Sequence, residues 1–156
     1  MKTVMAVLIT TLAAGMVGYS ADKPNFSGAW SLDATKSDFG PMPAPTAMTR
    51  KVEHNDPSLT YTQEVQGGPQ GDQTIKMTYS TDGTETTNDL MGNPLKTTAK
   101  WDGSALVITG KADFGGNEVT LTDKWTLSDD GKVLTDALHF ESSQGAADVT
   151  YVMNKK

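Results

Sequence analysis

The chain of 156 residues contains no cysteine. This absence excludes disulfide bonds, thiolate chemistry, zinc sites with cysteine ligands and a lipoprotein cysteine. Positive charge is also scarce, because 13 Lys and Arg residues stand against 19 Asp and Glu residues, for a formal net charge of −6. Binding to nucleic acid or to an anionic membrane surface needs clustered Lys and Arg. We therefore expect neither kind of partner.

The familiar sequence patterns of catalytic and cofactor sites are missing as well. There is no Gly-x-Ser-x-Gly nucleophile motif and no glycine-rich nucleotide-binding motif. The only two histidines, His54 and His139, have no metal-ligand spacing around them. The Asp-Gly steps lack the alternating carboxylates of a calcium-binding loop, and hairpin turns account for them. The sequence predicts no cofactor, no metal site and no catalytic residue.

Residues 1–20 differ in kind from the rest of the chain. Lys2 gives a positive start, and the segment 4–18 is apolar and uncharged. This run is shorter than the roughly 20 residues of a membrane-spanning helix. Gly18 and Ser20 are small residues at the two positions that signal peptidases recognise. We expect a helical signal peptide that is cleaved after residue 20, which indicates export by a bacterium to the periplasm or the extracellular space, with no stable membrane insertion afterwards. A retained N-terminal anchor is the alternative.

After this leader, the chain consists of short segments in which polar and apolar residues alternate, which indicates β-strands. Turn residues such as Asp-Gly separate the segments at intervals of about 8–12 residues, the spacing of a β-sandwich or β-barrel. The short connections place successive strands side by side, and closure of the sheet removes exposed edges. The sequence thus predicts one domain, residues 21–156, that is an all-β, antiparallel up-and-down meander barrel of about eight to ten strands.

Three features resemble the calycin group, which includes the lipocalins and the fatty-acid-binding proteins. The segment Phe26-Ser27-Gly28-Ala29-Trp30 matches the opening Gly-x-Trp of the group. Lys100-Trp101-Asp102-Gly103 is similar to a strand and turn that are common in fatty-acid-binding proteins. The strand count also suits the ten-stranded type. The resemblance implies that Gly28 and Trp30 are the structural signature of the barrel, with Trp30 closing one end, and that the interior holds a small molecule.

The chain departs from the patterns of this group in three places. Fatty-acid-binding proteins have a two-helix lid after the first strand, but the three prolines of residues 41–45 favour an extended segment with Phe39 beneath it. Lipocalins pack a basic side chain from near the C-terminus against the opening Trp, and Lys155 and Lys156 are the available candidates. The Arg-x-Tyr that holds a fatty-acid carboxylate is replaced here by residues 149–151, which keep only the tyrosine.

The strand faces that we assign to the interior carry the candidate ligand-binding residues. Arg50, the only arginine, shares a face with Met48 and Val52. Its guanidinium can hold a ligand carboxylate or phosphate, or it can pair with Asp123 or Asp136. These two aspartates are also the candidates for acid–base chemistry, but no second element supports that chemistry, and a polar contact near a barrel end is the favoured explanation. With the aromatic residues, which either line an apolar pocket or fill the barrel, the predicted ligand-binding residues are Arg50, Tyr61, Tyr79, Trp101, Trp125 and Tyr151.

The sequence favours an exported, non-catalytic barrel that binds a small hydrophobic molecule or lipid. One alternative is a packed barrel without an internal ligand, which acts in the cell envelope through its surface. A more remote alternative is a small hydrolase or isomerase on this fold, which requires a polar cluster deep in the cavity with a strongly shifted titrating group. No pattern in the sequence predicts an oligomeric state.

Overall fold

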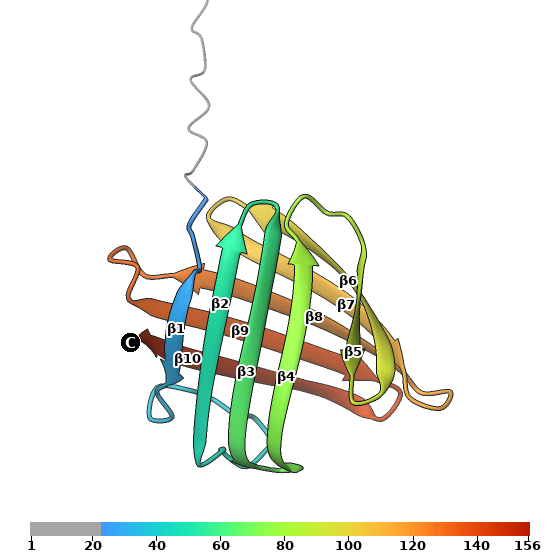
Figure 1. Ribbon diagram of the computed structural model, residues 1–156. Coiled ribbons are helices and arrows are strands. Elements are labelled where there is room, and N and C mark those ends of the chain that lie inside the picture. The colour runs from blue at the N-terminus through green and yellow to red at the C-terminus, as the bar shows by residue number, and fades with distance from the viewer. Residues whose placement is uncertain (1–22) are drawn as a thin grey trace, which may run out of the picture.

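The structure is a computed structural model that describes residues 23–156, so the predicted signal peptide and its cleavage site lie outside the described residues. Ten antiparallel strands form a single sheet, which confirms the predicted all-β meander (Figure 1). Residues 23–156 contain no helix, and therefore none long and apolar enough to cross a membrane. The strands are β1 (Gly28–Leu32), β2 (Ala47–Asn55), β3 (Ser58–Gly68), β4 (Gly71–Ser80), β5 (Thr86–Leu90), β6 (Asn93–Asp102), β7 (Ala105–Asp113), β8 (Glu118–Leu127), β9 (Val133–Ser142) and β10 (Gly145–Lys155).

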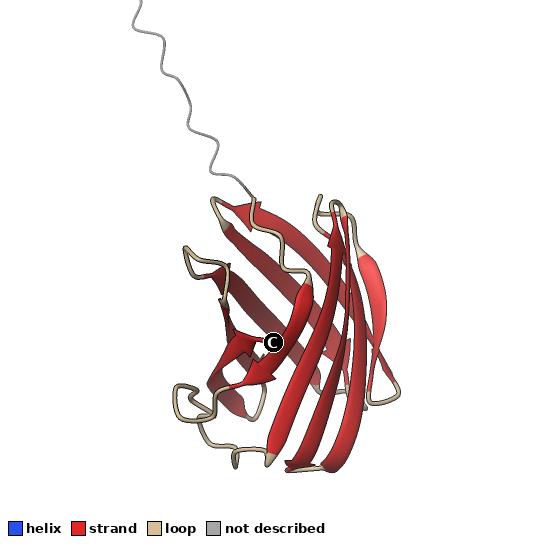
Figure 2. Cartoon of the chain, turned by 60° about the vertical axis from the view of Figure 1, so that its left-hand side comes forward, coloured by secondary structure: helices blue, strands red, loops and turns tan. Residues whose placement is uncertain are grey.

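The sheet runs in the order β4-β3-β2-β1-β10-β9-β8-β7-β6-β5. Every hydrogen-bonded pair of neighbours except β1 and β10 is therefore consecutive in sequence. Trp30 of β1 lies opposite Arg50 of β2 on one side and opposite Lys155 of β10 on the other. The sheet curves until its two edge strands, β4 and β5, approach each other, and Figure 2 shows the resulting nearly closed barrel.

Side chains close the seam between β4 and β5, which no backbone ladder joins. The Oδ1 atom of Asn88 accepts a hydrogen bond from the Thr78 backbone N–H at 2.7 Å, and its Nδ2 atom donates to the Thr78 carbonyl at 3.0 Å. The Thr86 hydroxyl donates to the same carbonyl at 3.0 Å. A primary amide offers a donor and an acceptor side by side. Asn88 therefore replaces one peptide unit of the missing strand pairing.

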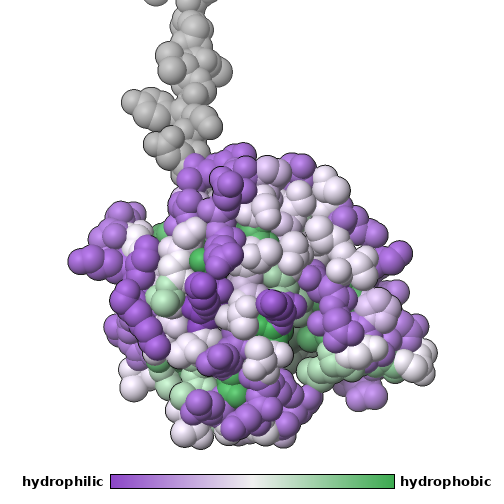
Figure 3. All heavy atoms as spheres, viewed as in Figure 1, coloured by the Kyte–Doolittle hydropathy of each residue, from purple (hydrophilic) through white to green (hydrophobic). Residues whose placement is uncertain are grey.

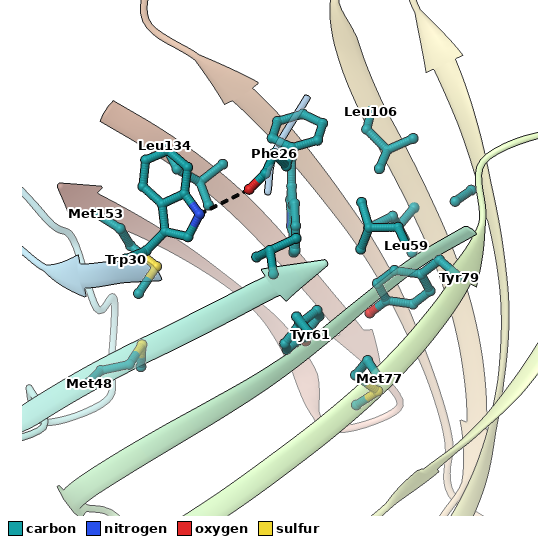
Figure 4. Packing of buried hydrophobic residues seen from close by; sticks show 14 of the residues in the cluster. Phe26, Trp30, Met48, Leu59, Tyr61, Met77, Tyr79, Leu106, Leu134 and Met153 are labelled. Carbon is teal, nitrogen blue, oxygen red and sulfur yellow. Dashed lines mark hydrogen bonds between the residues drawn. The ribbon is translucent and has the colours of Figure 1, made fainter. Parts of the chain in front are cut away.

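One end of the barrel is filled by apolar side chains around Trp30. Its indole N–H donates to the Phe26 carbonyl at 3.0 Å, as the dashed line in Figure 4 shows. Lys155 Nζ lies 5.3 Å from the centroid of the Trp30 ring, so Lys155 is the basic partner near the C-terminus. The largest fully buried side chains at this end include Phe26, Trp30, Leu106, Trp125, Leu134 and Met153. Trp30 closes one end of the barrel, as the resemblance implied.

Gly28 is required by the close approach of Lys155 to this end. Its φ angle is +145°, and a Cβ atom at this position would lie 2.8 Å from Cε of Lys155. A side chain at residue 28 would therefore be strained by the backbone and would displace the lysine from Trp30. This geometry explains the glycine of the Gly-x-Trp segment.

The connection between β1 and β2 crosses the other end of the barrel. Asp38 forms an isolated β-bridge with Thr150 of β10, and the rings of Phe39 and Tyr151 meet edge-on with centroids 6.1 Å apart. Residues 33–46 contain no helix, so the expected extended segment takes the place of a helical lid. The outer surface in the view of Figure 3 is mainly hydrophilic, with small hydrophobic areas between charged side chains.

Candidate ligand-binding site

A cavity of about 280 Å³ occupies the part of the barrel away from Trp30. Alternate residues of a strand point to the same face, so inward residues of β2 to β6 and β8 to β10 converge on this space. The segment 39–45 covers it from the β1–β2 connection. The walls are predominantly apolar, and they include Met48, Val65, Ile75, Met77, Leu121 and Phe140.

A buried guanidinium lies at one side of the cavity. Arg50 is only 3% exposed, and its Nη2 atom donates to Oδ2 of Asp136 at 2.6 Å. Its Nε atom donates to Oε1 of Gln63 at 2.8 Å. The Cζ atom lies 4.8 Å from the ring centroid of Tyr61 and 4.7 Å from that of Trp125, which are cation–π distances. The ion pair, the hydrogen bond and the two rings fix the orientation of Arg50.

The Asp123 carboxyl lies beside this ion pair and is held by the indole of Trp125, whose Nε1 donates to its Oδ2 at 3.0 Å. Burial raises the pKa of Asp123 well above its usual value of 3.8, and the charge of Asp136 and a hydrogen bond between the two carboxyls add to the effect. Burial alone would lower the pKa of Arg50, but the negative charge of Asp136 outweighs it and raises that pKa. The cluster therefore consists of the Arg50–Asp136 ion pair and the Asp123 carboxyl, whose raised pKa favours its uncharged form.

Three tyrosine hydroxyls complete the polar part of the cavity. Burial raises the pKa of Tyr61 to about 12 and that of Tyr79 well above 10.0. Burial, followed by the charge of Asp136, also raises the pKa of Tyr151. All three side chains are therefore neutral hydrogen-bonding groups near neutral pH.

Within residues 23–156, three polar atoms of this cluster are buried without a hydrogen-bond partner: Nη1 of Arg50, Oδ1 of Asp123 and Oδ1 of Asp136. A proton shared between the two carboxyls would satisfy one oxygen of each. The Nη1 atom of Arg50 still remains a buried donor without an acceptor. Such a group costs about 1–3 kcal/mol when it is left unpaired, so the cluster has an unused capacity for one polar ligand atom.

The structure brings five of the six predicted residues together. Arg50, Tyr61, Tyr79 and Tyr151 line the cavity, and Trp125 lies behind the guanidinium, fully buried. Trp101 does not line the cavity, and its ring stacks on Phe26 with a centroid distance of 5.9 Å and an interplanar angle of 8°. Both indoles come from inward strand faces and pack against Phe26, with Leu106 opposite each of them in the strand register, but of the two only Trp125 also reaches the Arg50 guanidinium.

Sequence reasoning missed Gln63, which hydrogen-bonds Arg50 and lines the cavity. A signal was available, because Gln63 shares one strand face with Tyr61 and Val65, and an amide among apolar residues is unusual there. The part played by Met42 and Pro43 in covering the cavity carries no comparable sequence signal.

No protein-family model matches the chain, and none of the curated proteins compared with it matches. Solved structures do resemble it. A zebrafish ileal bile-acid-binding protein complexed with cholic acid has a TM-score of 0.60 and 16% identity, over 84% of this chain and 98% of that chain. Secretory abundant heat soluble protein 4 from Ramazzottius varieornatus has a TM-score of 0.52 and 16% identity, over 84% of this chain and 94% of that chain.

A second secretory abundant heat soluble protein from Ramazzottius varieornatus has a TM-score of 0.56 and 12% identity, over 83% of this chain and 94% of that chain. At these levels of identity the likeness concerns the fold. The chain has the ten-stranded, calycin-like barrel fold, similar to that of the lipocalins and fatty-acid-binding proteins.

Proposed function

We propose that the protein binds a small apolar or amphipathic molecule inside its barrel and does not catalyse a reaction. The observation that carries this proposal is the cavity of about 280 Å³, which has apolar walls and one buried polar cluster. Ligand sites generally combine apolar walls with a few placed polar groups, in volumes of roughly 300–1,000 Å³. The cavity therefore suits a ligand at the small end of this range. The bile-acid-binding neighbour, complexed with cholic acid, supports the use of such a barrel for binding.

We also propose that residues 1–20 are a cleaved signal peptide and that the mature protein acts in the periplasm or outside a bacterial cell. The support is the positive start, the apolar run and the small residues before the cleavage position. The intact mass of the protein from fractionated host cells tests this proposal. A mass that still includes residues 1–20, or recovery only from the cytoplasm, would contradict it.

Ligand binding is tested with protein purified from its own host. Native mass spectrometry should detect a retained small molecule, and a panel of lipids should quench tryptophan fluorescence, because Trp125 lies next to the cavity cluster. The variant Ile75→Trp fills the cavity and should abolish binding, since Ile75 lines it. Lys76→Trp adds the same indole on the exposed outer face and is the matched control. Absence of both a retained molecule and quenching in the wild type would overturn the proposal.

Acid–base catalysis is a second candidate function, and the Asp123–Asp136 pair favours it. A carboxyl with a strongly raised pKa, next to a second carboxyl in a cavity, is the arrangement of a general acid beside a base. A panel of small esters and enolisable ketones tests this candidate. Turnover that disappears in Asp123→Asn, while the variant remains folded, would replace binding by catalysis as the conclusion.

A further inference from the structure

We propose that the cavity selects an amphiphile with an uncharged polar group, such as an alcohol, ester or amide, over a carboxylate of the same chain length. This inference rests on the proposed binding function and specifies its ligand class. It follows from the balance of charges in the cavity and from the unpartnered atoms of the polar cluster.

The cavity wall offers no net charge to an ionic ligand. Among the cavity-lining residues of the described chain, Arg50 is the only base, and Asp123 and Asp136 are the only acids. The Arg50 guanidinium already has its counter-ion, because Nη2 lies 2.6 Å from Oδ2 of Asp136. Burial raises the pKa of Asp123 and so favours its uncharged form. With Asp123 uncharged, the three groups together carry no net charge.

An ionic head group would be unfavourable in this setting. A carboxylate that approached Nη1 of Arg50 would also approach the negative charge of Asp136, with which Arg50 is paired. Like charges a few ångströms apart in a poorly solvated site disfavour ionisation. A buried charge without its own counter-ion is costly in any case. An ammonium head group would be repelled by the positive charge of Arg50, and it would find no unpaired carboxylate as a counter-ion.

An uncharged oxygen atom meets the needs of the same cluster. Nη1 of Arg50 is a buried donor without an acceptor, and a hydroxyl or carbonyl oxygen of the ligand supplies one. A ligand hydroxyl also has a proton to give to a carboxyl oxygen of Asp123 or Asp136, because such an oxygen has two lone pairs and can accept a bond besides the shared proton. The neutral hydroxyls of Tyr61 and Tyr79 extend this uncharged hydrogen-bonding surface along the cavity.

Probes with ten carbon atoms and different head groups test the inference on the wild-type protein. We would measure 1-decanol, decanoate and decylamine by displacement of a fluorescent apolar dye, below the concentrations at which they aggregate. Decanol should bind at least about tenfold more tightly than decanoate, equivalent to about 1.4 kcal/mol. Decanoate labelled with ¹³C at its carboxyl should bind as the neutral acid, with a raised pKa seen by NMR. Decanoate that binds ionised, and as tightly as decanol, would overturn the inference and leave the binding function intact. If none of the three probes displaces the dye, both proposals fail.

The variant Asp136→Asn tests the charge argument directly. It removes the counter-ion of Arg50, so the guanidinium becomes available to an anion and decanoate should gain at least about tenfold relative to decanol. Asp130→Asn makes the same chemical change at an exposed turn between β8 and β9 and should leave the preference unchanged. A folded Asp136→Asn protein with the wild-type preference would overturn the inference. If this variant does not fold, the ¹³C titration of the wild type decides.

Discussion

Replacing Arg50 by methionine should severely destabilise the interior of the barrel. The substitution leaves Asp136, itself 2% exposed, as a buried carboxylate without a counter-ion, and it leaves Oε1 of Gln63 without its donor. Removal of one partner of a buried ion pair costs about 3–5 kcal/mol. Methionine fills much of the same volume, so the apolar contacts with Tyr61 and Trp125 are partly kept. We therefore expect the free energy of unfolding to fall by about 3–5 kcal/mol, a large part of the 5–15 kcal/mol typical of a domain.

Urea unfolding followed by tryptophan fluorescence measures this loss. The double variant Arg50→Met/Asp136→Leu should recover most of the stability, because replacing both members of a buried pair by apolar residues is often neutral or stabilising. Lys51→Met is the surface control, since Lys51 pairs with Glu53 at 3.2 Å while both side chains are 72% exposed. It should change stability by less than about 1 kcal/mol. An Arg50→Met protein as stable as this control, or a double variant no better than the single one, would refute the reasoning.

Three further substitutions probe other features of the structure. Burial holds the pKa of Asp123 above 3.8, so the folded chain keeps a proton that the unfolded chain releases, and stability should fall as the pH rises from 3.8 towards the raised value. Asp123→Asn should lack this decline in thermal unfolding and gain stability relative to the wild type from pH 4 to pH 7. Asn88→Ala should cost about 1–3 kcal/mol and speed hydrogen exchange at the Thr78 amide, because the β4–β5 seam loses its bridge. Lys155→Met should cost about 0.5–1 kcal/mol in urea unfolding, because the cation over the Trp30 ring is lost.

Each of these substitutions has a matched control. Hydrogen bonds lower the pKa of exposed Asp130. As the pH rises, the stability of Asp130→Asn relative to the wild type should therefore change in the opposite direction to that of Asp123→Asn. Thr87→Ala changes the exposed neighbour of Asn88 and should leave the Thr78 amide protected. Lys156→Met removes the adjacent lysine, which does not lie over Trp30. Equal effects of a substitution and its control would contradict the corresponding explanation.

The period-2 pattern predicted the strands and which residues face the interior. Arg50, Tyr61 and Asp136 all point inward as the alternation indicated, because a strand has only two faces. Alternation does not give the height of a residue along the barrel axis, which depends on the register between strands far apart in sequence. For this reason the sequence left Asp123 and Asp136 as equal partners for Arg50, and it did not indicate that Trp125 reaches the guanidinium whereas Trp101 does not.

Sequence patterns also could not predict where the seam of the barrel lies or which lysine lies over Trp30. The polar strand that contains Asn88 reads like any exposed strand, and nothing in its composition marks it as an edge of the sheet. Lys155 and Lys156 are distinguished only by the register of β10 against β1, which places Lys155 opposite Trp30. Both features result from tertiary pairing, so local patterns could not have identified them.

The position of β1 in the sheet has a consequence for how the chain folds. β1 pairs with its sequence neighbour β2 on one side, but its other neighbour is β10, at the far end of the chain. Closing so long a loop is entropically unfavourable, and contacts between distant residues slow folding. During synthesis, the edge of β1 that will pair with β10 therefore stays open while the eight strands between them are made. The sheet is completed only after β10 has left the ribosome.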